Sequence, residues 1–332
     1  MLLLWILIFV VSLAVLIKGA DWMLSSAERI GLAIGLSPFI VGVLIVGIGT
    51  SFPEVVSSLT AVFKGATDIV TANAVGSNIA NVLLIVGFSA IFGRRLVVTK
   101  NLIDIDLPLL AISTVMVLGI VWDKQVTFIE GIILLLSYVV YILYTIFHRE
   151  DEGEKTPSKF LPSRLDRRKH LSVLVNVMPR SKSKVKLKDV IFLIVGVVCL
   201  VFGARYLIEA VIQLSTILNI GTGVIAISAV AFGTSLPELI VSIRAAMKHK
   251  VEIALGNIFG SNVFNALAVI GIPALVKNLE VDDKTFYIGV PTMALATLLF
   301  IISGISKKIY MWEGALYLML YILFIGKLFA LF

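Results

Sequence analysis

Two stretches of this sequence are near copies of one another. Residues 47–58 read GIGTSFPEVVSS, and residues 231–242 read AFGTSLPELIVS. An offset of 184 positions superposes them, so that Glu54 corresponds to Glu238. The same offset aligns ANAVGSNIAN at 72–81 with GNIFGSNVFN at 256–265. An ungapped offset across both segments indicates an internal duplication, and the rest of the chain is interpreted from it.

The composition around these copies is that of a membrane protein. Of 332 residues, 59% are hydrophobic and only 15% are charged, and the mean hydropathy is +1.05. A water-soluble fold of this length cannot hide so much apolar surface, whereas a bilayer accepts it, at roughly 20 apolar residues per span. No Lys or Arg precedes Lys18. The first apolar run therefore lacks the basic start of a signal peptide, and we interpret it as an uncleaved span.

Apolar runs separated by polar breaks predict an all-α membrane protein of ten transmembrane helices, because open sheet edges cannot be satisfied in lipid. Residues 1–147 would form a first five-helix repeat, 148–188 a basic loop and 189–332 a second five-helix repeat. Since five is odd, the second repeat must enter the membrane upside down, which gives two inverted-topology repeats. The predicted spans are 2–20, 36–62, 68–91, 106–122, 127–147, 189–209, 221–247, 252–275, 286–303 and 311–331.

The long polar stretch at 148–188 sets the orientation. It is rich in Lys and Arg. A basic stretch can bind nucleic acid, but beside membrane helices it indicates a cytoplasmic loop. The sequence therefore predicts a multi-pass protein of the cell membrane with both termini outside. The short loops that this places inside agree, since they carry Arg29, Arg94, Arg95, Lys100, Arg244, Lys248, Lys250, Lys307 and Lys308.

Glu54 and Glu238 each lie inside a predicted span. A charge near the bilayer centre costs at least about 2.5–3.5 kcal/mol. The apolar parts of the spans that carry them, and of the spans that follow, offer no Lys or Arg as a partner. An uncompensated pair of carboxylates favours a bound cation over a purely structural role.

A proline precedes each glutamate. Pro53 and Pro237 lack an N–H, and their rings clash with the carbonyls of Gly49 and Gly233. We expect both helices to break there and to leave carbonyl groups free just before the proline. Many prolines only kink membrane helices, but a glutamate follows both of these. The combination favours carbonyl oxygens that point inward as ligands.

Hydroxyl and amide side chains extend this oxygen-rich set. Thr50 lies four residues before Glu54 and so shares its helical face. Stripes of this kind can simply hold helices together. With no thiolate or imidazole in the set, however, the ligands suit the hard cations Ca²⁺, Na⁺, Mg²⁺ and Mn²⁺, and a flexible carbonyl-lined cavity favours Ca²⁺ over Mg²⁺. The following spans carry polar residues every four positions, at Asn73, Ser77 and Asn81 and at Asn257, Ser261 and Asn265.

At GTSFPE (49–54) with GSNIAN (76–81), and GTSLPE (233–238) with GSNVFN (260–265), the chain resembles the Na⁺/Ca²⁺ exchanger family of the calcium/cation antiporter superfamily, prokaryotic type. The resemblance covers nearly the whole chain. It implies exchange of several Na⁺ for one Ca²⁺, with alternating access achieved by sliding the first span of each half against a fixed core. Ca²⁺ and Na⁺ would be the transported ions, with no cofactor and no obligate protein partner.

The resemblance also implies a role for each matching residue. Glu54 and Glu238 would bind Ca²⁺, helped by the carbonyls of Thr50 and Thr234. Asn81 and Asn265 would line the centre. Some relatives carry Asp at the position of Asn265, and one branch associates that Asp with K⁺ dependence, so Asn265 argues against K⁺ co-transport. Sodium sites would use the hydroxyls of Thr50, Ser51, Thr234, Ser235, Ser77 and Ser261, and the carbonyls of Gly47 and Ala231.

Three alternatives remain at this stage. A proton-driven antiporter for Ca²⁺ or another divalent ion would use the same carboxylates, although the GNxxE-like motif of proton-coupled relatives is absent. A cation channel would need an uninterrupted pore, which the sequence does not exclude. An intramembrane enzyme is disfavoured, because the chain has no HExxH pair and no Ser or Cys beside a membrane-embedded His.

Overall fold

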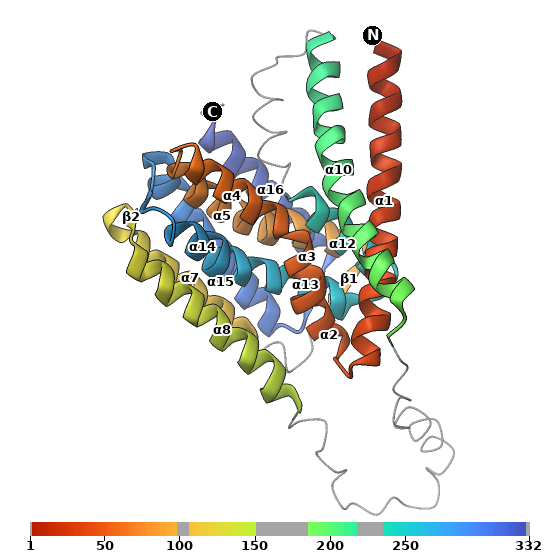
Figure 1. Ribbon diagram of the computed structural model, residues 1–332, viewed down its shortest axis with the longest axis horizontal. Coiled ribbons are helices and arrows are strands. Elements are labelled where there is room, and N and C mark those ends of the chain that lie inside the picture. Colours follow the sequence, from red (N-terminus) through yellow and green to blue (C-terminus); the bar gives the residue numbers. More distant parts are fainter. Residues whose placement is uncertain (1, 98–105, 151–184, 218–234, 330–332) are drawn as a thin grey trace, which may run out of the picture.

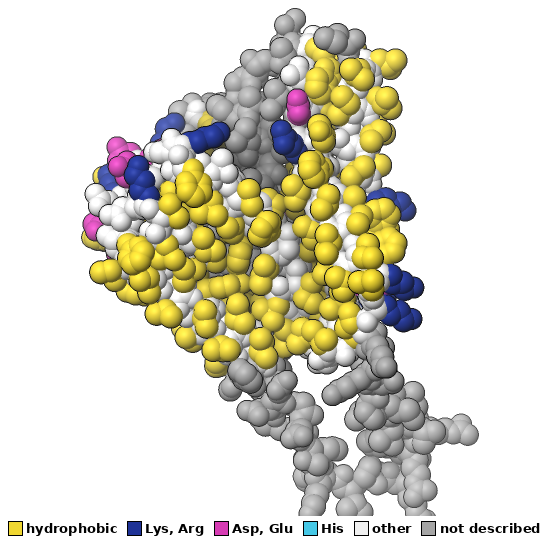
Figure 2. Space-filling model, in the orientation of Figure 1, with side chains coloured by type: hydrophobic (Ala, Val, Ile, Leu, Met, Phe, Trp, Pro, Cys, Tyr) yellow, Lys and Arg dark blue, Asp and Glu magenta, His cyan; other side chains and the backbone are white. Residues whose placement is uncertain are grey.

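The structure is a computed structural model that describes residues 2–97, 106–150, 185–217 and 235–329. Two long helices, α1 (Leu2–Ala33) and α10 (Leu187–Ile217), run side by side and antiparallel at one edge of the molecule (Figure 1). The other helices form a second body next to this pair. Hydrophobic side chains cover most of the face seen in Figure 2, and charged ones lie mainly toward its margins, as expected of a surface in contact with lipid.

The first half continues from α1 through short helical segments, of which η1 and η2 are π-helical and η4 is a 3₁₀ turn. Its elements are α2 (Pro38–Ile40), η1 (Val41–Gly47), α3 (Ile48–Thr50), α4 (Phe52–Phe63), α5 (Asp68–Ile79), η2 (Ala80–Ile85), α6 (Val86–Phe92), β1 (Arg95–Val97), α7 (Leu107–Ile120), η4 (Val121–Asp123), β2 (Gln125–Val126) and α8 (Phe128–Glu150).

The second half repeats this plan after α10, with two further π-helical segments, η6 and η7. Its elements are α12 (Leu236–Met247), α13 (Val251–Phe264), η6 (Asn265–Val269), α14 (Ile270–Ala274), β3 (Leu279–Glu280), η7 (Thr285–Gly289), α15 (Val290–Ile305), β4 (Lys308–Tyr310) and α16 (Met311–Leu328).

The prediction of a mostly helical protein with many membrane spans is confirmed. Of the predicted spans, 106–122 appears as a shorter apolar helix, Leu107–Asp123, and 221–247 is described only from Ser235 onward, where it forms α12. In the described part, eight helical segments are long and apolar enough to cross a membrane: Leu2–Ala33, Pro38–Phe63, Asp68–Phe92, Phe128–Ile146, Leu187–Leu207, Val251–Ala274, Thr285–Ile305 and Met311–Leu328.

Two details differ from the sequence-based expectation. The first span was expected to end at residue 20, but α1 continues to Ala33, because the polar residues after Lys18 include no helix breaker. Its 32 residues are about 48 Å long, so its second half extends beyond a hydrocarbon core of about 30 Å. The expected all-α fold also contains four short strands, at loops where backbone groups pair across the two halves.

The four strands form two antiparallel ribbons that the internal duplication relates to each other. β1 pairs with β4, and β2 pairs with β3, both antiparallel. The 184-residue offset relates Arg95 of β1 to Leu279 of β3, and Gln125 of β2 to Ile309 of β4, so each ribbon is the repeat counterpart of the other. Each ribbon also joins one half to the other. This exchange of partners is what two repeats related by a pseudo-two-fold axis produce.

The centre of the second body is the span Val251–Ala274, which is almost entirely buried. Its helix α13 packs closely on η1, where a Cβ added to Gly260 would lie 2.6 Å from the Val43 carbonyl oxygen. Only glycine permits that approach. At Gly76, the repeat counterpart of Gly260, an added Cβ would meet nothing within 4 Å among the described residues, and position 227, the counterpart of Val43, lies outside them.

Candidate cation site

A break in the helix precedes each glutamate. Helix α3 ends at Thr50, Ser51 has φ −89° and ψ 5°, and α4 begins at Phe52 with Pro53 in its first turn. In the second half, Ser235 has φ −88° and ψ 3°, and Pro237 lies in the first turn of α12. The two halves therefore build the same junction from related sequences.

These junctions place both glutamates in the first turn of a helix. Glu54 lies in the first turn of α4 and Glu238 in that of α12, where unsatisfied N–H groups and the helix dipole favour negative charge. Their relative exposures are 0% and 2%. In the described part of the chain, no ion pair involves Glu238. The helix ends therefore offset part of the cost of burying two acids.

A hydrogen bond crosses between the halves at these junctions. The Ser51 hydroxyl donates to Oε1 of Glu238 over 2.8 Å. The other carboxylate oxygen of Glu238 is buried and has no hydrogen-bond partner among the described residues. A second contact joins the hydroxyls of Ser235 and Ser77 at 3.4 Å. The helix break of each half is therefore linked to the other half.

The carbonyl of Gly47 was expected to be free, but it accepts hydrogen bonds. The Ser51 N–H lies 3.0 Å from it, and the hydroxyls of Thr50 and Ser261 lie at 3.2 and 3.4 Å. The two hydroxyls can turn away, whereas the N–H cannot. One lone pair of this oxygen is thus held by the backbone, and the other remains available to an ion.

Two buried amides lie on the helices that follow the glutamates. Asn81 is in η2 and Asn265 begins η6, and each is 1% exposed. Both polar atoms of the Asn81 side chain, and Oδ1 of Asn265, lack a hydrogen-bond partner among the described residues. Buried polar atoms without partners are rare, and a bound ion or water is a common reason. Both amides also occupy π-helical turns, which often occur at functional sites.

Asn257 has a larger part in the site than its place in a polar stripe indicated. Its Oδ1 lies 3.1 Å from the Thr50 hydroxyl, and its Nδ2 donates to Ser242 over 2.8 Å. The single Thr50 proton serves either this Oδ1 or the Gly47 carbonyl. When the Thr50 hydroxyl donates to Asn257, the Gly47 oxygen no longer accepts a hydrogen bond from it. The sequence signal was its position four residues before Ser261, a spacing that the first repeat shares at Asn73 and Ser77.

Most of the predicted site residues lie in the described part. The structure connects Gly47, Thr50 and Ser51 of the first break to α12 and α13, and connects Ser235 to Ser77 of α5. Gly49 and Pro53 lie at the first break, and Pro237 at the second. Three predicted residues, Thr234, Ala231 and Gly233, lie outside the described residues.

The donor set differs from that of a typical metal cluster. No group of three or more His, Cys, Asp or Glu side chains that could hold a metal occurs among the described residues. The available ligands are two carboxylates with neutral amide, hydroxyl and carbonyl oxygens. Such a set suits hard cations that bind and leave again.

The sequence model of the sodium/calcium exchanger protein family matches residues 4–147 and 188–330. The chain belongs to this family. Membership of the exchanger family places it among membrane transporters of cations rather than among enzymes. The matched residues include both glutamates and both amides described above.

Alignments with individual relatives span almost the whole of this chain. The sodium/calcium exchanger MaX1 of Methanosarcina acetivorans is 31% identical over 97% of this chain and 98% of its own length. An uncharacterized membrane protein of Methanocaldococcus jannaschii, MJ0091, is 31% identical over 99% of both chains. A structure of the sodium-calcium exchanger NCX_Mj, soaked with zero Na⁺ and Ca²⁺, matches with a TM-score of 0.77 at 29% identity, covering 99% of this chain and 100% of that one.

Proposed function

We propose that this protein is a secondary active antiporter that exchanges Na⁺ for Ca²⁺ at one site shared by its two halves. Glu54 and Glu238 would bind the Ca²⁺. The observation that carries the proposal is the bond from Ser51 to Glu238. It joins the break of one half to the carboxylate of the other, so that the ligands converge from two duplicated helix junctions.

Charge balance supports Ca²⁺ as one substrate. Two carboxylates neutralise one divalent ion, and the helix N-termini that hold them favour their charged form. The carbonyls of Thr50 and Thr234 would add neutral ligands to the Ca²⁺, with Asn81 and Asn265 at the centre. Ca²⁺ accepts six to eight oxygens in irregular geometry, which this mixed set can supply.

Na⁺ would bind to hydroxyl and carbonyl groups around the same carboxylates. Its ligands would be the hydroxyls of Thr50, Ser51, Thr234, Ser235, Ser77 and Ser261 and the carbonyls of Gly47 and Ala231. Since both ions depend on Glu54 and Glu238, the site cannot hold Ca²⁺ and a full set of Na⁺ together. Mutual exclusion of this kind makes the cycle an exchange.

Alternating access would come from sliding α1 and α10 together against the second body. The two helices pack more extensively on each other than on the rest of the molecule, which supports the idea (Figure 1). In the same view, α1 begins and α16 ends on one side of the molecule, while α8 ends and α10 begins on the opposite side. Ten spans in two inverted repeats, with both termini outside the cell and the basic 148–188 loop in the cytoplasm, fit this arrangement.

A binding measurement tests the shared site directly. Purified protein in detergent should bind Ca²⁺ calorimetrically, and added Na⁺ should weaken that binding competitively at constant ionic strength set with a large organic cation. Glu54→Gln should remove the Ca²⁺ signal. Ca²⁺ binding that Na⁺ leaves unchanged would favour a proton-driven antiporter or a channel instead.

A further inference from the structure

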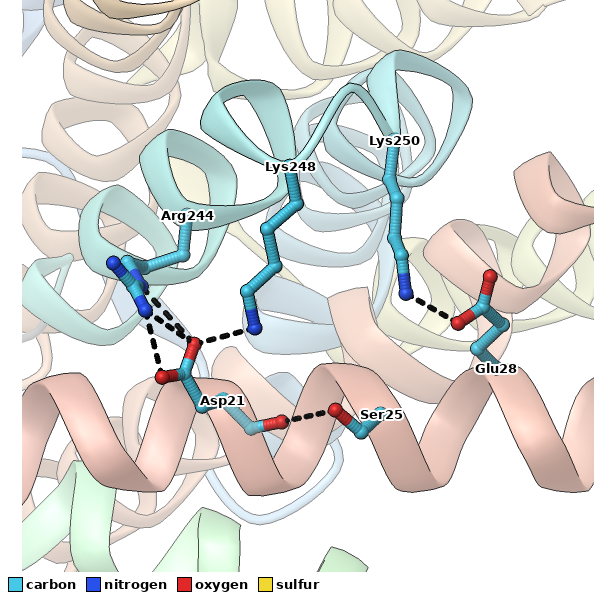
Figure 3. A network of polar contacts seen from close by, with 6 residues as sticks. All are labelled: Asp21, Ser25, Glu28, Arg244, Lys248 and Lys250. Carbon is cyan, nitrogen blue, oxygen red and sulfur yellow. Dashed lines mark hydrogen bonds and ion pairs between the residues drawn. The ribbon is translucent and has the colours of Figure 1, made fainter.

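An ionic cluster connects α1 to α12 and to the turn after it. Asp21 accepts three hydrogen bonds from Arg244, with Nη2 2.7 Å from Oδ2 and 2.8 Å from Oδ1 and with Nε 3.0 Å from Oδ1. Asp21 also pairs with Lys248 at 2.7 Å. Two turns further along α1, Glu28 pairs with Lys250. Figure 3 shows both acids on α1, with all three cations reaching toward them from the neighbouring segment. We call these five residues the ionic latch.

The latch crosses a boundary that must move during transport. Within the sliding pair, α1 and α10 are packed so closely that a Cβ added to Gly19 would lie 2.8 Å from the Cβ of Cys199. Arg29 and Asp189 also join these two helices, at 2.6 Å. The latch, in contrast, ties the pair to the body that holds the ion site. Sliding can leave the Arg29–Asp189 bond intact, but it must break the latch.

The latch acts on the helix that carries Glu238. Arg244 and Lys248 follow that glutamate by six and ten residues, so Lys248 lies about 15 Å from it along the axis. The side chains of the latch are partly buried, with exposures between 22% and 35%. Ion pairs in that environment are screened less than fully exposed ones. While the latch is formed, α1 stays against α12 on the side of the site where Asp21 lies.

The duplication provides no counterpart at the other end of the site. The 184-residue offset relates Asp21 to Arg205, Arg244 to Thr60 and Lys248 to Lys64. Arg205, Thr60 and Lys64 are all exposed, and α10 makes no contact with α4 comparable to that of α1 with α12 among the described residues. A mirror-image contact between α10 and α4 would bring the cations Arg205 and Lys64 toward each other, and none of the five positions that correspond to the latch holds an acid.

We propose that the ionic latch is a one-sided conformational lock, which makes the ion-free exchanger favour the state closed on the side of Asp21. This inference rests on the proposed alternating access. Attraction at one end and cation repulsion at the other both favour the same state. Ion binding must then supply the free energy that opens the latch, so the two faces of the protein differ although the repeats are alike.

Thiol labelling at Leu24 reports on the latch. Leu24 is three residues after Asp21 and four before Glu28, so it shares their face of α1, and it is 0% exposed. A Leu24→Cys reporter in a Cys199→Ser background, in lipid nanodiscs without Na⁺ or Ca²⁺, should react slowly with a polar maleimide. Asp21→Asn should raise the labelling rate about tenfold, the scale of a lost charged hydrogen-bond pair.

Three companion variants separate the latch from general loosening. Arg29→Gln breaks an equally short ion pair inside the sliding pair, and it should leave the labelling rate unchanged. Lys64→Glu disturbs nothing in the latch, yet it should raise the rate by offering Arg205 a partner in the opposite state. Glu28→Lys should raise the rate, and adding Lys250→Glu should restore it.

The latch proposal is overturned if Asp21→Asn labels at the parental rate, if Arg29→Gln labels as fast as Asp21→Asn, or if the Glu28–Lys250 charge swap restores nothing. Should Asp21→Asn fold poorly, Lys64→Glu and the Glu28–Lys250 charge swap decide, since an unchanged rate in the first or no restoration in the second also contradicts the proposal. Vesicle transport is scored separately. Parental protein without Na⁺-driven Ca²⁺ uptake would refute the proposed exchange, whereas normal uptake with unchanged labelling would refute only the latch.

Discussion

The Ser51 hydroxyl donates a 2.8 Å hydrogen bond to Oε1 of Glu238, although the two residues are 187 positions apart. Ser51 is the non-helical residue of the first break, and Glu238 lies in the first turn after the second break. The bond therefore shows that the two duplicated helix breaks contact each other. The predictions below depend on the ion site lying at this contact.

Neutralising either glutamate should abolish exchange. Glu54→Gln and Glu238→Gln keep the side-chain shape but remove a charge that binds Ca²⁺. Because a buried ion that loses one charged partner is strongly destabilised, the affinity of the protein for Ca²⁺ should fall about 100-fold or more. Na⁺-driven ⁴⁵Ca²⁺ uptake into vesicles should fall to background while size-exclusion profiles stay normal. Asp68→Asn is the matched control, because Asp68 is an exposed acid at the start of α5. Retained exchange in a glutamine variant would move the site elsewhere.

Removing the Ser51 hydroxyl should weaken Na⁺ binding. Ser51→Ala loses both an expected Na⁺ ligand and a donor to Glu238, and a hydrogen bond to a charged group is worth about 1.5–3 kcal/mol. The Na⁺ concentration for half-maximal Ca²⁺ release should rise at least about tenfold. Ser89→Ala removes a hydroxyl that is equally buried but has no hydrogen-bond partner among the described residues, and it should change nothing. Equal behaviour of the two variants would contradict this role.

Asn257 should matter more than its hydrogen-bonded neighbour Ser242. Asn257→Leu withdraws the acceptor for the Thr50 hydroxyl and the donor to Ser242 together. We expect a loss of about 1–3 kcal/mol in the free energy of unfolding and a several-fold weaker affinity for both ions. Ser242→Ala leaves the Thr50 contact intact and should retain near-normal affinity. Thermal unfolding and calorimetric binding on the same samples separate the two effects.

Protons should compete with Ca²⁺. Two buried carboxylates at the proposed shared site would resist ionising together, and protonating either would remove charge that the ion needs. Lowering the pH therefore opposes binding, and uptake should decline from about pH 7.5 to about pH 5.5. Raising the Ca²⁺ concentration should restore it, because the two cations compete. A flat profile over this range would show that the carboxylates do not bind the transported ion.

The sequence was sufficient for most of the fold because its signals were long or duplicated. Apolar runs of membrane length located the helices, and the repeated Pro-Glu pairs located the buried acids. The strand pairing of Arg95 with Tyr310 could not be foreseen, since it depends on how the two halves dock. The π-helical turns at Asn81 and Asn265 also leave no pattern that a period-based interpretation detects.

The roles of individual polar side chains were harder to predict. Asn257 was placed on a stripe that could simply hold helices together, and only its contact with Thr50 distinguishes it. The carbonyl of Gly47 was expected to be free because of the following proline, yet the Ser51 N–H reaches it. Both outcomes depend on distances across packed helices, which spacing along one helix does not determine.

Na⁺-dependent Ca²⁺ uptake is the most direct test of the exchange itself. Sealed vesicles containing the purified protein are loaded with Na⁺ and diluted into Na⁺-free medium with ⁴⁵Ca²⁺, and matched vesicles receive equal Na⁺ on both sides. The account predicts uptake that requires the outward Na⁺ gradient, stops when an ionophore dissipates it and is absent from Glu54→Gln vesicles. Uptake that proceeds equally without the gradient, or that follows a pH gradient alone, would contradict it.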